Sequence, residues 1–365
     1  MPLKAFIYRH RLVGKRMVAM LSQVLPSAAS RRLRALAERV AFNLTPQYQG
    51  ETLPPIFHYW SGRYLTPDVK RLGIGSPEEF YLARIVEQAA GATGAVRVLS
   101  VGSGAASMEI ALAEKLKAAG VPAQVLCLDF NPGLMRKAAA DATERGLAGL
   151  IAFDTRDCNK PFDLAHQDVI IVNQFFHHVT ELETFCASLR ASLAPRGLLL
   201  TSDIVGRNGH RLWPDVDAEV QRFWTGLPPE KRFDRYFGSV QEHYRSIDHA
   251  AYSNEGVRAQ DIVRCLLAEF DFELFLSFAG AIMPFIERRA GFNFDPQHAE
   301  DRELIDRVQA ADAAGLAAGR YPAVNMIAAL RHKGAVTQAT HVPVSPERHA
   351  ELTRQQLAKL LGARA

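Results

Sequence analysis

Short apolar runs alternate along this chain with longer segments in which apolar residues recur every three or four positions. The short runs are rich in β-branched residues and suit strands buried on both faces, while the periodic segments suit amphipathic helices. Alternation of the two kinds predicts an α/β protein with a mostly parallel sheet. Seven strands are predicted, at 96–101, 124–128, 150–153, 168–172, 198–203, 272–278 and 324–331.

Helices are predicted between these strands and at the two ends of the sheet region. The best-marked start is Ser76-Pro77-Glu78-Glu79, where Ser76 can cap the helix, Pro77 suits its first position and Glu79 completes a capping box. This helix runs toward Gly91. Further helices are predicted at 108–116, 134–144, 181–193, 254–270, 288–319 and 346–361.

A glycine-rich turn follows the first strand, and an acidic residue ends the second. Gly102-Ser103-Gly104 allows a sharp turn and a close approach of the backbone to a ligand. Asp129 can accept hydrogen bonds from both hydroxyls of a ribose, so this βαβ unit predicts a nucleoside site. The alternative is that Asp129 is a solvated residue at a strand end. The dehydrogenase pattern would require a third glycine where Ser107 stands.

Three stretches of the chain, VLSVGSGAASMEIALA, LCLDFNP and PRGLLLTSD, resemble the class I S-adenosylmethionine-dependent methyltransferases. The resemblance implies a doubly wound, Rossmann-like, seven-stranded sheet with an antiparallel last strand. It also implies S-adenosyl-L-methionine as cofactor and S-adenosyl-L-homocysteine as product. Around this sheet we expect a helical N-terminal cap (1–93), a methyltransferase domain (94–334) with a substrate-cover insertion (206–255), and a C-terminal tail (335–365).

The resemblance also assigns cofactor contacts to individual positions. Gly102, Ser103 and Gly104 would lie at the methionine portion. Asp129 would lie at the ribose, and Asp157 and Cys158 at the adenine, where Asp154 is a competitor; Phe130 is also expected to contact the cofactor. Asn173 and Phe175 follow the fourth strand and would lie beside the methyl group; Phe175 or Phe176 can shield it from water.

Two adjacent histidines follow the same strand, where ligands of open parallel sheets bind. His177 or His178 is placed to take a proton from a nucleophile, and their opposite side-chain directions decide which one faces it. The alternative is that both are structural histidines with satisfied hydrogen bonds.

Aromatic residues gather in two places that can reach a substrate. One lies just upstream of the sheet, with Tyr59, Trp60 and Tyr64, and the other is the insertion, with Trp213 and Tyr236. Such rings suit a ring-bearing or cationic ligand. The alternatives are that the first group pins helices onto the core and that the second forms the core of a helical satellite.

Composition adds two features. The chain has 365 residues, of which 48% are hydrophobic, and a net charge of +4. Residues 1–44 hold nine Lys or Arg and one acid, which is +8 and leaves −4 for the rest. This segment is interpreted as a helical cap; a membrane-surface or nucleic-acid arm and an organelle targeting segment are the alternatives.

The patterns of cysteines, histidines and apolar residues argue against a disulfide-stabilised protein, a metal motif and a membrane span. Four cysteines lack CxxC spacing and are interpreted as reduced, packed thiols of a cytoplasmic protein. Histidines form no known metal motif, and no apolar run reaches about 18 residues. Nucleic-acid substrates are disfavoured because NQFF follows the fourth strand instead of an amino-methylating motif, and no Pro-Cys pair exists.

The predicted function is in-line methyl transfer, without a metal, to a small and ring-bearing organic substrate. The alternatives are a lipid or quinone acceptor at a membrane surface, a cofactor-binding protein that transfers no methyl group, and a nicotinamide oxidoreductase. The acceptor, the atom methylated and the oligomeric state stay open.

Overall fold

The computed structural model describes residues 53–362 of the chain. The predictions made for the basic segment 1–44 lie outside the described residues. So does most of the proline-flanked stretch that follows it.

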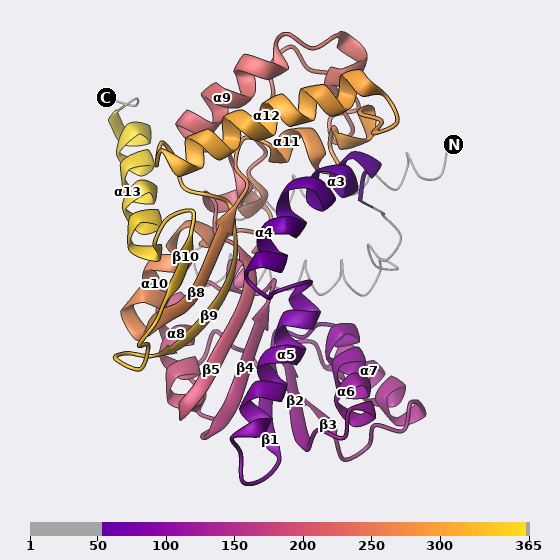
Figure 1. The fold of residues 1–365 in the computed structure, drawn as a ribbon, viewed down its shortest axis with the longest axis vertical. Helices are drawn as coiled ribbons and strands as arrows, with labels where there is room; N and C mark the ends of the chain where they lie inside the picture. Colours follow the sequence, from indigo (N-terminus) through magenta and orange to yellow (C-terminus); the bar gives the residue numbers. More distant parts are fainter. Residues whose placement is uncertain (1–52, 363–365) are drawn as a thin grey trace.

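An eight-stranded mixed sheet forms the centre of the molecule, in the order β10-β8-β9-β5-β4-β1-β2-β3 (Figure 1). All strands run parallel except β9, which lies antiparallel between β5 and β8. The strands are β1 (Val96–Val101), β2 (Ala123–Asp129), β3 (Ile151–Thr155), β4 (Gln167–Asn173), β5 (Leu193–Ile204), β8 (Phe270–Phe278), β9 (Asn325–His332) and β10 (Thr340–Val342).

All seven predicted strands are confirmed, but the count of seven is wrong by one. The extra strand, β10, pairs parallel with β8 at the sheet edge. Three residues are too few to show an alternating pattern, and they lie in a stretch that was predicted to be a tail. The antiparallel strand is therefore the last but one along the chain.

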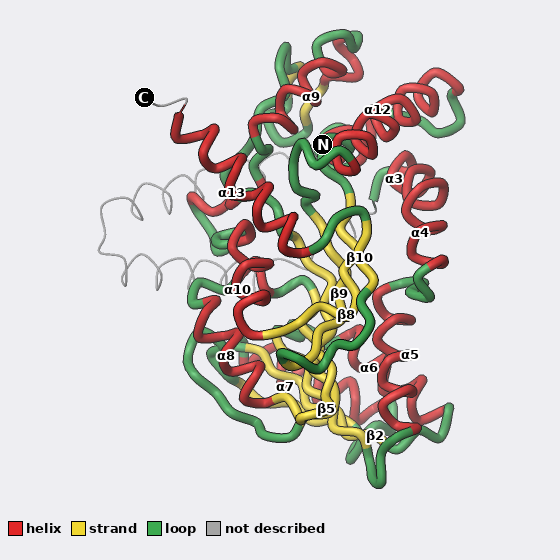
Figure 2. Tube along the Cα trace, turned by 60° about the vertical axis from the view of Figure 1, so that its left-hand side comes forward, coloured by secondary structure: helices red, strands yellow, loops and turns green. Residues whose placement is uncertain are grey.

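Helices cover both faces of the sheet (Figure 2). Helices α5 (Pro77–Ala90), α6 (Ser107–Ala118) and α7 (Pro132–Glu144) pack on one face, and α8 (Leu182–Ser192) and α10 (Ile262–Glu269) pack on the other. The predicted capping box at the start of α5 is present, with the Glu79 amide donating to Ser76 Oγ at 3.1 Å. The side chain of Asn131 caps α7 just after β2.

Two predicted helices begin later than expected. The segment predicted as a helix at 254–270 is helical only from Ile262, because Gly256 adopts a left-handed φ of 67°. This leaves Glu255 in a loop. Similarly, α12 (Ala299–Ala317) covers only part of 288–319, and it packs against the rest of the chain, since Ile305 and Val308 are buried.

A second layer of helices lies above the carboxyl edge of the parallel strands (Figure 1). Helix α12 packs there with α3 (Pro55–Trp60), α9 (Pro214–Trp224) and α11 (Met283–Ile286) around a separate apolar core. A π-helix (Ser61–Leu65) and α4 (Thr66–Arg71) continue α3 down toward the sheet. Short strands β6 (Phe233–Asp234) and β7 (Ser239–Val240) form a hairpin in the insertion.

The last helix, α13 (Pro346–Gly362), packs on α9 and α10. Its Gln356 side chain donates to Asp215 at the start of α9, at 2.8 Å. The stretch predicted as a tail therefore ends in a docked helix.

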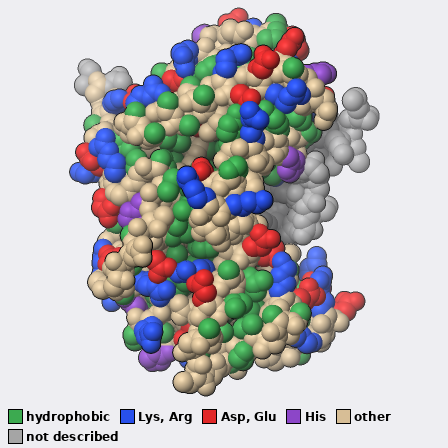
Figure 3. All heavy atoms as spheres, in the orientation of Figure 1, with side chains coloured by type: hydrophobic (Ala, Val, Ile, Leu, Met, Phe, Trp, Pro, Cys, Tyr) green, Lys and Arg blue, Asp and Glu red, His purple; other side chains and the backbone are tan. Residues whose placement is uncertain are grey.

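The cysteines and the charged side chains of the surface can be described together. All four cysteines are buried and unpaired, as predicted. On the face drawn in Figure 3, basic and acidic side chains are interspersed. No helix in the described part of the chain combines the length and apolar character that a membrane crossing requires.

Candidate active site at the carboxyl edge of the sheet

The glycine turn lies at the carboxyl end of β1 and is tied to β2 by its own backbone. The amides of Gly102 and Ser103 both donate to the carbonyl of Leu128, at 2.8 and 3.1 Å. Gly102 and Gly104 have left-handed φ values of 75° and 57°. A side-chain carbon added at Gly104 would meet nothing within 4 Å, so this edge of the turn is open.

Asp129 ends β2 directly beside this turn. Its carboxylate accepts from the Gly104 amide at 3.0 Å and from the Asn131 amide at 2.8 Å, and the residue is only 6% exposed. Burial raises the pKa of this carboxyl, while the amides that donate to it oppose the rise. Each carboxylate oxygen has a second lone pair, so the pair of oxygens can still accept from two hydroxyls.

The loop after β3 lies against the same residue. The amide of Arg156 donates to the carbonyl of Asp129 at 2.9 Å, which brings Asp157 and Cys158 to the side of the turn where Asp129 lies. Cys158 is buried, and burial with the charge of Asp129 raises the pKa of its thiol to about 12. Asp157 and Asp154 are both half-exposed, so the predicted choice between them stays a prediction.

The segment after β4 covers the turn from the other side. A side-chain carbon on Gly102 would lie 2.1 Å from the ring of Phe175, so only glycine allows this contact. Asn173 accepts from the Tyr81 hydroxyl at 3.0 Å. The glycine turn, Asp129, the 157–158 loop and Phe175 thus meet at one edge, with Gly104 open. These residues fit a nucleoside cofactor held through its ribose hydroxyls.

His177 forms a buried ion pair. Its Nδ1 lies 2.6 Å from Asp203 Oδ1, and Asp203 also accepts from the amides of Phe175 and Phe176. Burial alone would lower the pKa of His177, which is 3% exposed. Asp203 and Glu255 outweigh that effect and raise its pKa to about 10. The ring is therefore an imidazolium at neutral pH.

His178 has the opposite character. Burial and the positive charge of His177 lower its pKa to about 4, so its ring is neutral, and 27% of its side chain is exposed. Of the two adjacent histidines, only His178 is uncharged and accessible at neutral pH. The two rings lie side by side, with centroids 4.2 Å apart, and both face Glu255, so the expectation that they point in opposite directions is wrong. The two pKa values differ because Asp203 accepts a hydrogen bond from His177.

Two further residues, His210 and Glu255, lie beside His177 and His178, and we call these four residues the histidine cluster. The sequence analysis did not single out His210 or Glu255. Glu255 Oε1 lies 2.9 Å from His210 Nε2 and 3.4 Å from His177 Nε2, and Glu255 Oε2 lies 3.6 Å from His178 Nε2. Burial opposes the charge on Glu255, but the histidines hold its pKa well below the usual range. Both residues belong to the insertion, where no local pattern marks them. Asp203 could have been found from the sequence, since an acidic residue at the end of a predicted buried strand lies at the edge where ligands bind.

Most of the predicted substrate residues lie elsewhere. Trp60 is 2% exposed and donates to Gln309, and Trp213 is fully buried in the core of the upper layer, so neither ring lines an open surface and their contact with a substrate stays a prediction. Large aromatic rings each bury a large apolar area, so they suit the interior of that core. The Tyr59 hydroxyl donates to Asp306 of α12 at 2.8 Å, and Tyr64 lies nearby.

Tyr236 is different. Its ring centroid lies 6.5 Å from that of His249, which lies 5.9 Å from that of His210. A line of rings therefore connects this tyrosine to the histidine cluster.

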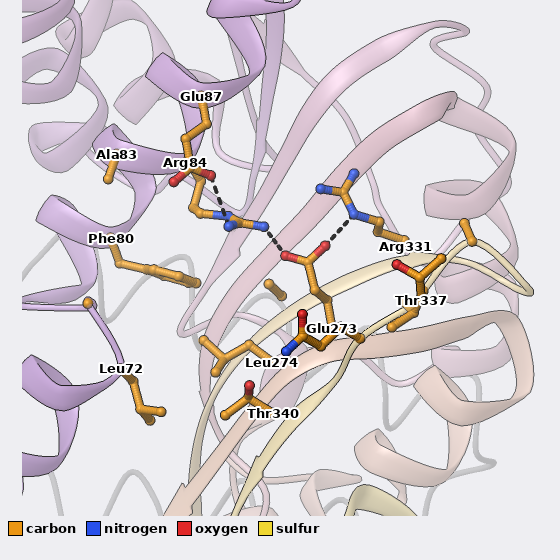
Figure 4. A pocket seen from close by; sticks show the side chains of 15 residues that line it. Leu72, Phe80, Ala83, Arg84, Glu87, Glu273, Leu274, Arg331, Thr337 and Thr340 are labelled. Atoms are coloured by element: carbon orange, nitrogen blue, oxygen red, sulfur yellow. Dashed lines mark hydrogen bonds and ion pairs between the residues drawn. The ribbon is translucent and has the colours of Figure 1, made fainter.

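A groove of about 670 Å³ lies between α5 and the β8–β9–β10 edge, near the amino ends of the parallel strands (Figure 4). Glu273 forms ion pairs with both Arg84 and Arg331 at its centre. Arg84 also pairs with Glu87 at 2.9 Å. The groove is thus remote from the glycine turn, and its central charges are paired internally.

Residues 99–201, from β1 to β5, match the family model described as a methyltransferase domain. This range contains the glycine turn, Asp129, the 157–158 loop and the histidine pair. No curated protein sequence matches the chain significantly.

The chain is also similar to several solved structures, among them a [4+2]-cyclase and two O-methyltransferases. The [4+2]-cyclase SpnF is 16% identical (69% of this chain and 79% of that chain covered, TM-score 0.38). The StiE O-methyltransferase is 12% identical (84% and 88%, 0.41). An O-methyltransferase of a Brevibacillus brevis trans-AT polyketide synthase, in complex with S-adenosyl-L-homocysteine, is 11% identical (85% and 90%, 0.39). At these identities no residue role is transferred from them.

Proposed function

We propose that this chain, in which residues 99–201 match a methyltransferase-domain model, is an S-adenosylmethionine-dependent methyltransferase that methylates a small organic acceptor at an atom that loses a proton. The observation that carries the proposal is the placement of His178. This neutral, accessible histidine is three residues from Phe175, whose ring covers the glycine turn.

The cofactor supplies a methyl carbon already activated by a sulfonium, so the chain itself has three tasks: alignment, exclusion of water and acceptance of a proton. Asp129 would hold the ribose, with Asp157 or Asp154 at the adenine, and the open edge at Gly104 would hold the methionine portion. Phe175 would shield the reacting centre. The transfer step needs no metal, since the leaving group is a neutral thioether.

His178 is the base that we propose for the acceptor. Its Nε2 lies 3.6 Å from Glu255, which would stabilise the imidazolium formed when His178 takes a proton. His177 cannot serve, because Asp203 and Glu255 keep it protonated. The rings of Tyr236 and His249 favour an acceptor that is itself flat or ring-bearing.

The first experiment is calorimetric titration of the purified chain with S-adenosyl-L-methionine, S-adenosyl-L-homocysteine and NAD. We expect micromolar-range binding of the first two and none of NAD. Binding of NAD alone would move the chain to hydride chemistry and overturn the proposal.

The base is tested with labelled cofactor and a panel of phenols, catechols and heteroaromatic amines. His178→Asn should lower turnover roughly 100-fold or more while the affinity for S-adenosyl-L-homocysteine stays near wild type. His166→Asn is the matched control, because His166 is an exposed histidine at the amino end of the same β4. Equal turnover in both variants would remove His178 from this role. Cofactor binding without turnover on any acceptor would favour a non-transferring protein.

A further inference from the structure

Two histidines and a glutamate of the histidine cluster lie beside the proposed base, His178. We infer that His177, His210 and Glu255 form a binding site for one divalent transition-metal ion of the zinc type. One nitrogen from each histidine and one carboxylate oxygen from Glu255 lie within 4.8 Å of one another. This site goes beyond the methyl transfer proposed above, which needs no ion.

The spacing of these atoms suits a single ion. Zinc bonds to imidazole nitrogen and carboxylate oxygen are about 2.1 Å long, which places tetrahedral ligand atoms roughly 3.4 Å apart. Glu255 Oε1 is 3.4 Å from His177 Nε2 and 2.9 Å from His210 Nε2. Small side-chain rotations would therefore bring the three atoms into a first coordination shell.

The backbone holds the three segments in this arrangement. The Gly209 amide donates to the carbonyl of Gly256 at 2.9 Å, and the Val257 amide donates to the carbonyl of His177 at 3.1 Å. Backbone hydrogen bonds thus join the segment of His210 to that of Glu255, and the segment of Glu255 to His177. The arrangement does not depend on side-chain attraction alone.

His210 has a strained backbone. Its φ is 57°, a left-handed value that costs a non-glycine residue of order 1 kcal/mol or more and that persists where surrounding structure imposes it. Its Nδ1 is buried, with no hydrogen-bond partner among the described residues, so the ring makes its polar contact through Nε2. That nitrogen faces Glu255.

Asp203 acts as the outer partner that metal-binding histidines usually have. It accepts from His177 Nδ1 at 2.6 Å, which leaves Nε2 as the nitrogen that faces the site. A bound ion would take the place of the proton that Nε2 carries in the imidazolium, and that proton would be released to solvent. A carboxylate behind a histidine fixes the orientation of the ring and increases its basicity as a ligand. Asp203 is itself held by the amides of Phe175, Phe176 and Ile204.

The ligand atoms select the class of ion. Two imidazole nitrogens and one carboxylate favour zinc, iron, cobalt or nickel over magnesium and calcium, which prefer oxygen ligands. Three protein ligands leave at least one position for water or another oxygen. If the proposed function holds, that position suits a hydroxyl of the acceptor beside His178; this last point rests on the proposed function, whereas ion binding does not.

The test uses the full chain, with any purification tag removed and metals stripped by a chelator. Titration with Co²⁺ should give a visible d–d spectrum of a nitrogen- and oxygen-ligated ion, and calorimetry with Zn²⁺ should give one ion per chain. His210→Ala and Glu255→Gln should each weaken binding roughly 100-fold or more. Asp203→Asn should weaken it 10- to 100-fold.

The control variant is His243→Ala, which removes an exposed histidine of the same insertion and should bind the ion as wild type does. Binding of S-adenosyl-L-homocysteine, measured on every variant, reports whether the fold is intact. Binding that is unchanged in His210→Ala and Glu255→Gln, or a thiolate charge-transfer band, would overturn the proposed site. Loss of cofactor binding in the wild type would instead refute the proposed function, so the two failures are distinguishable.

Discussion

The two halves of the carboxyl edge are built in different ways. The cofactor half, with Gly102, Gly104 and Asp129, lies within one βαβ unit, and backbone amides hold its carboxylate. The acceptor half joins His177 and Asp203 to His210 and Glu255 of the insertion, and charged side chains hold it together.

This difference predicts different responses to substitution. Removal of Asp129 leaves two backbone amides without their acceptor but leaves no charged side chain unpaired, so its cost to the fold is smaller and the loss appears mainly in ligand binding. A buried carboxylate that pairs with a histidine and accepts from three amides leaves unpaired donors when it is removed, so the loss appears in stability. The predictions below test this contrast, from the largest expected effect to the smallest.

Asp203→Ala should destabilise the chain most. Removal of this fully buried carboxylate leaves His177 Nδ1 and the amides of Phe175 and Phe176 without their acceptor, which should lower the free energy of unfolding by about 3–5 kcal/mol. Urea unfolding measures the change. Asp163→Ala, at an exposed position before β4, should change it by less than about 0.5 kcal/mol. A loss below about 1 kcal/mol in Asp203→Ala would mean that the cluster is not held by buried charge.

Gly102→Ala and Gly104→Ala form a matched pair in the cofactor half. Both positions are left-handed, but only at Gly102 would the new carbon meet the Phe175 ring, at 2.1 Å. Gly102→Ala should cost roughly 2–4 kcal/mol of unfolding free energy, and Gly104→Ala about 1–2 kcal/mol. If the two losses are equal in urea unfolding, Phe175 does not lie on the turn.

Asp129→Ala tests the ligand-binding role of the same half. The loss of charged hydrogen bonds should weaken S-adenosyl-L-homocysteine binding by about 1.5–3 kcal/mol in calorimetry. Asp141→Ala, which removes an exposed carboxylate of α7 that pairs with Arg145, should leave the affinity unchanged. Unchanged affinity in Asp129→Ala as well would remove this residue from the ribose role.

His349 shows what burial does to a histidine without a carboxylate. It lies in α13, donates to the carbonyl of Ala323 at 2.9 Å, and burial lowers its pKa to about 4. The unfolded chain binds its proton near pH 6.5, so the stability that this neutral ring provides is present above that pH and is lost as the pH falls toward 4.

Between about pH 7 and pH 5 the wild type should therefore lose about 2 kcal/mol more unfolding free energy than His349→Gln does. Urea unfolding of both proteins at the two pH values measures this difference. Equal losses would show that the ring titrates normally in the folded chain. The contrast with His177, which two carboxylates keep protonated, would then not depend on burial.

The fold was largely predictable because central strands of the sheet, above all β4 and β5, are buried on both faces and therefore carry unbroken apolar runs. Ser76 and Glu79 predicted the start of α5 correctly, since a capping box involves only residues three apart. The strand β10 was not predicted because three residues are too few to show the alternation of apolar and polar side chains that marks a strand. The helix expected from Asn254 was wrong in its first turns because left-handed Gly256 is part of a loop stabilised by distant contacts, including that of Gly209.

The aromatic residues illustrate the limit of composition. Trp60 and Trp213 were expected to contact a substrate, and both fill the core of the upper layer. Nothing in the local sequence distinguishes a ring that packs against α12 from a ring that faces a ligand. Burial decides between them, and burial is a property of the assembled chain.

The sequence by itself determined the cofactor half of this protein. Gly102, Gly104 and Asp129 belong to one βαβ unit, whose geometry follows from short-range rules of turn, strand and helix, so the motif can be interpreted locally. Tertiary structure alone decided the acceptor half. It brought Glu255 and His210 to the histidine pair, made His177 a cation and left His178 neutral, because the charge of a histidine depends on which carboxylates the fold places beside it.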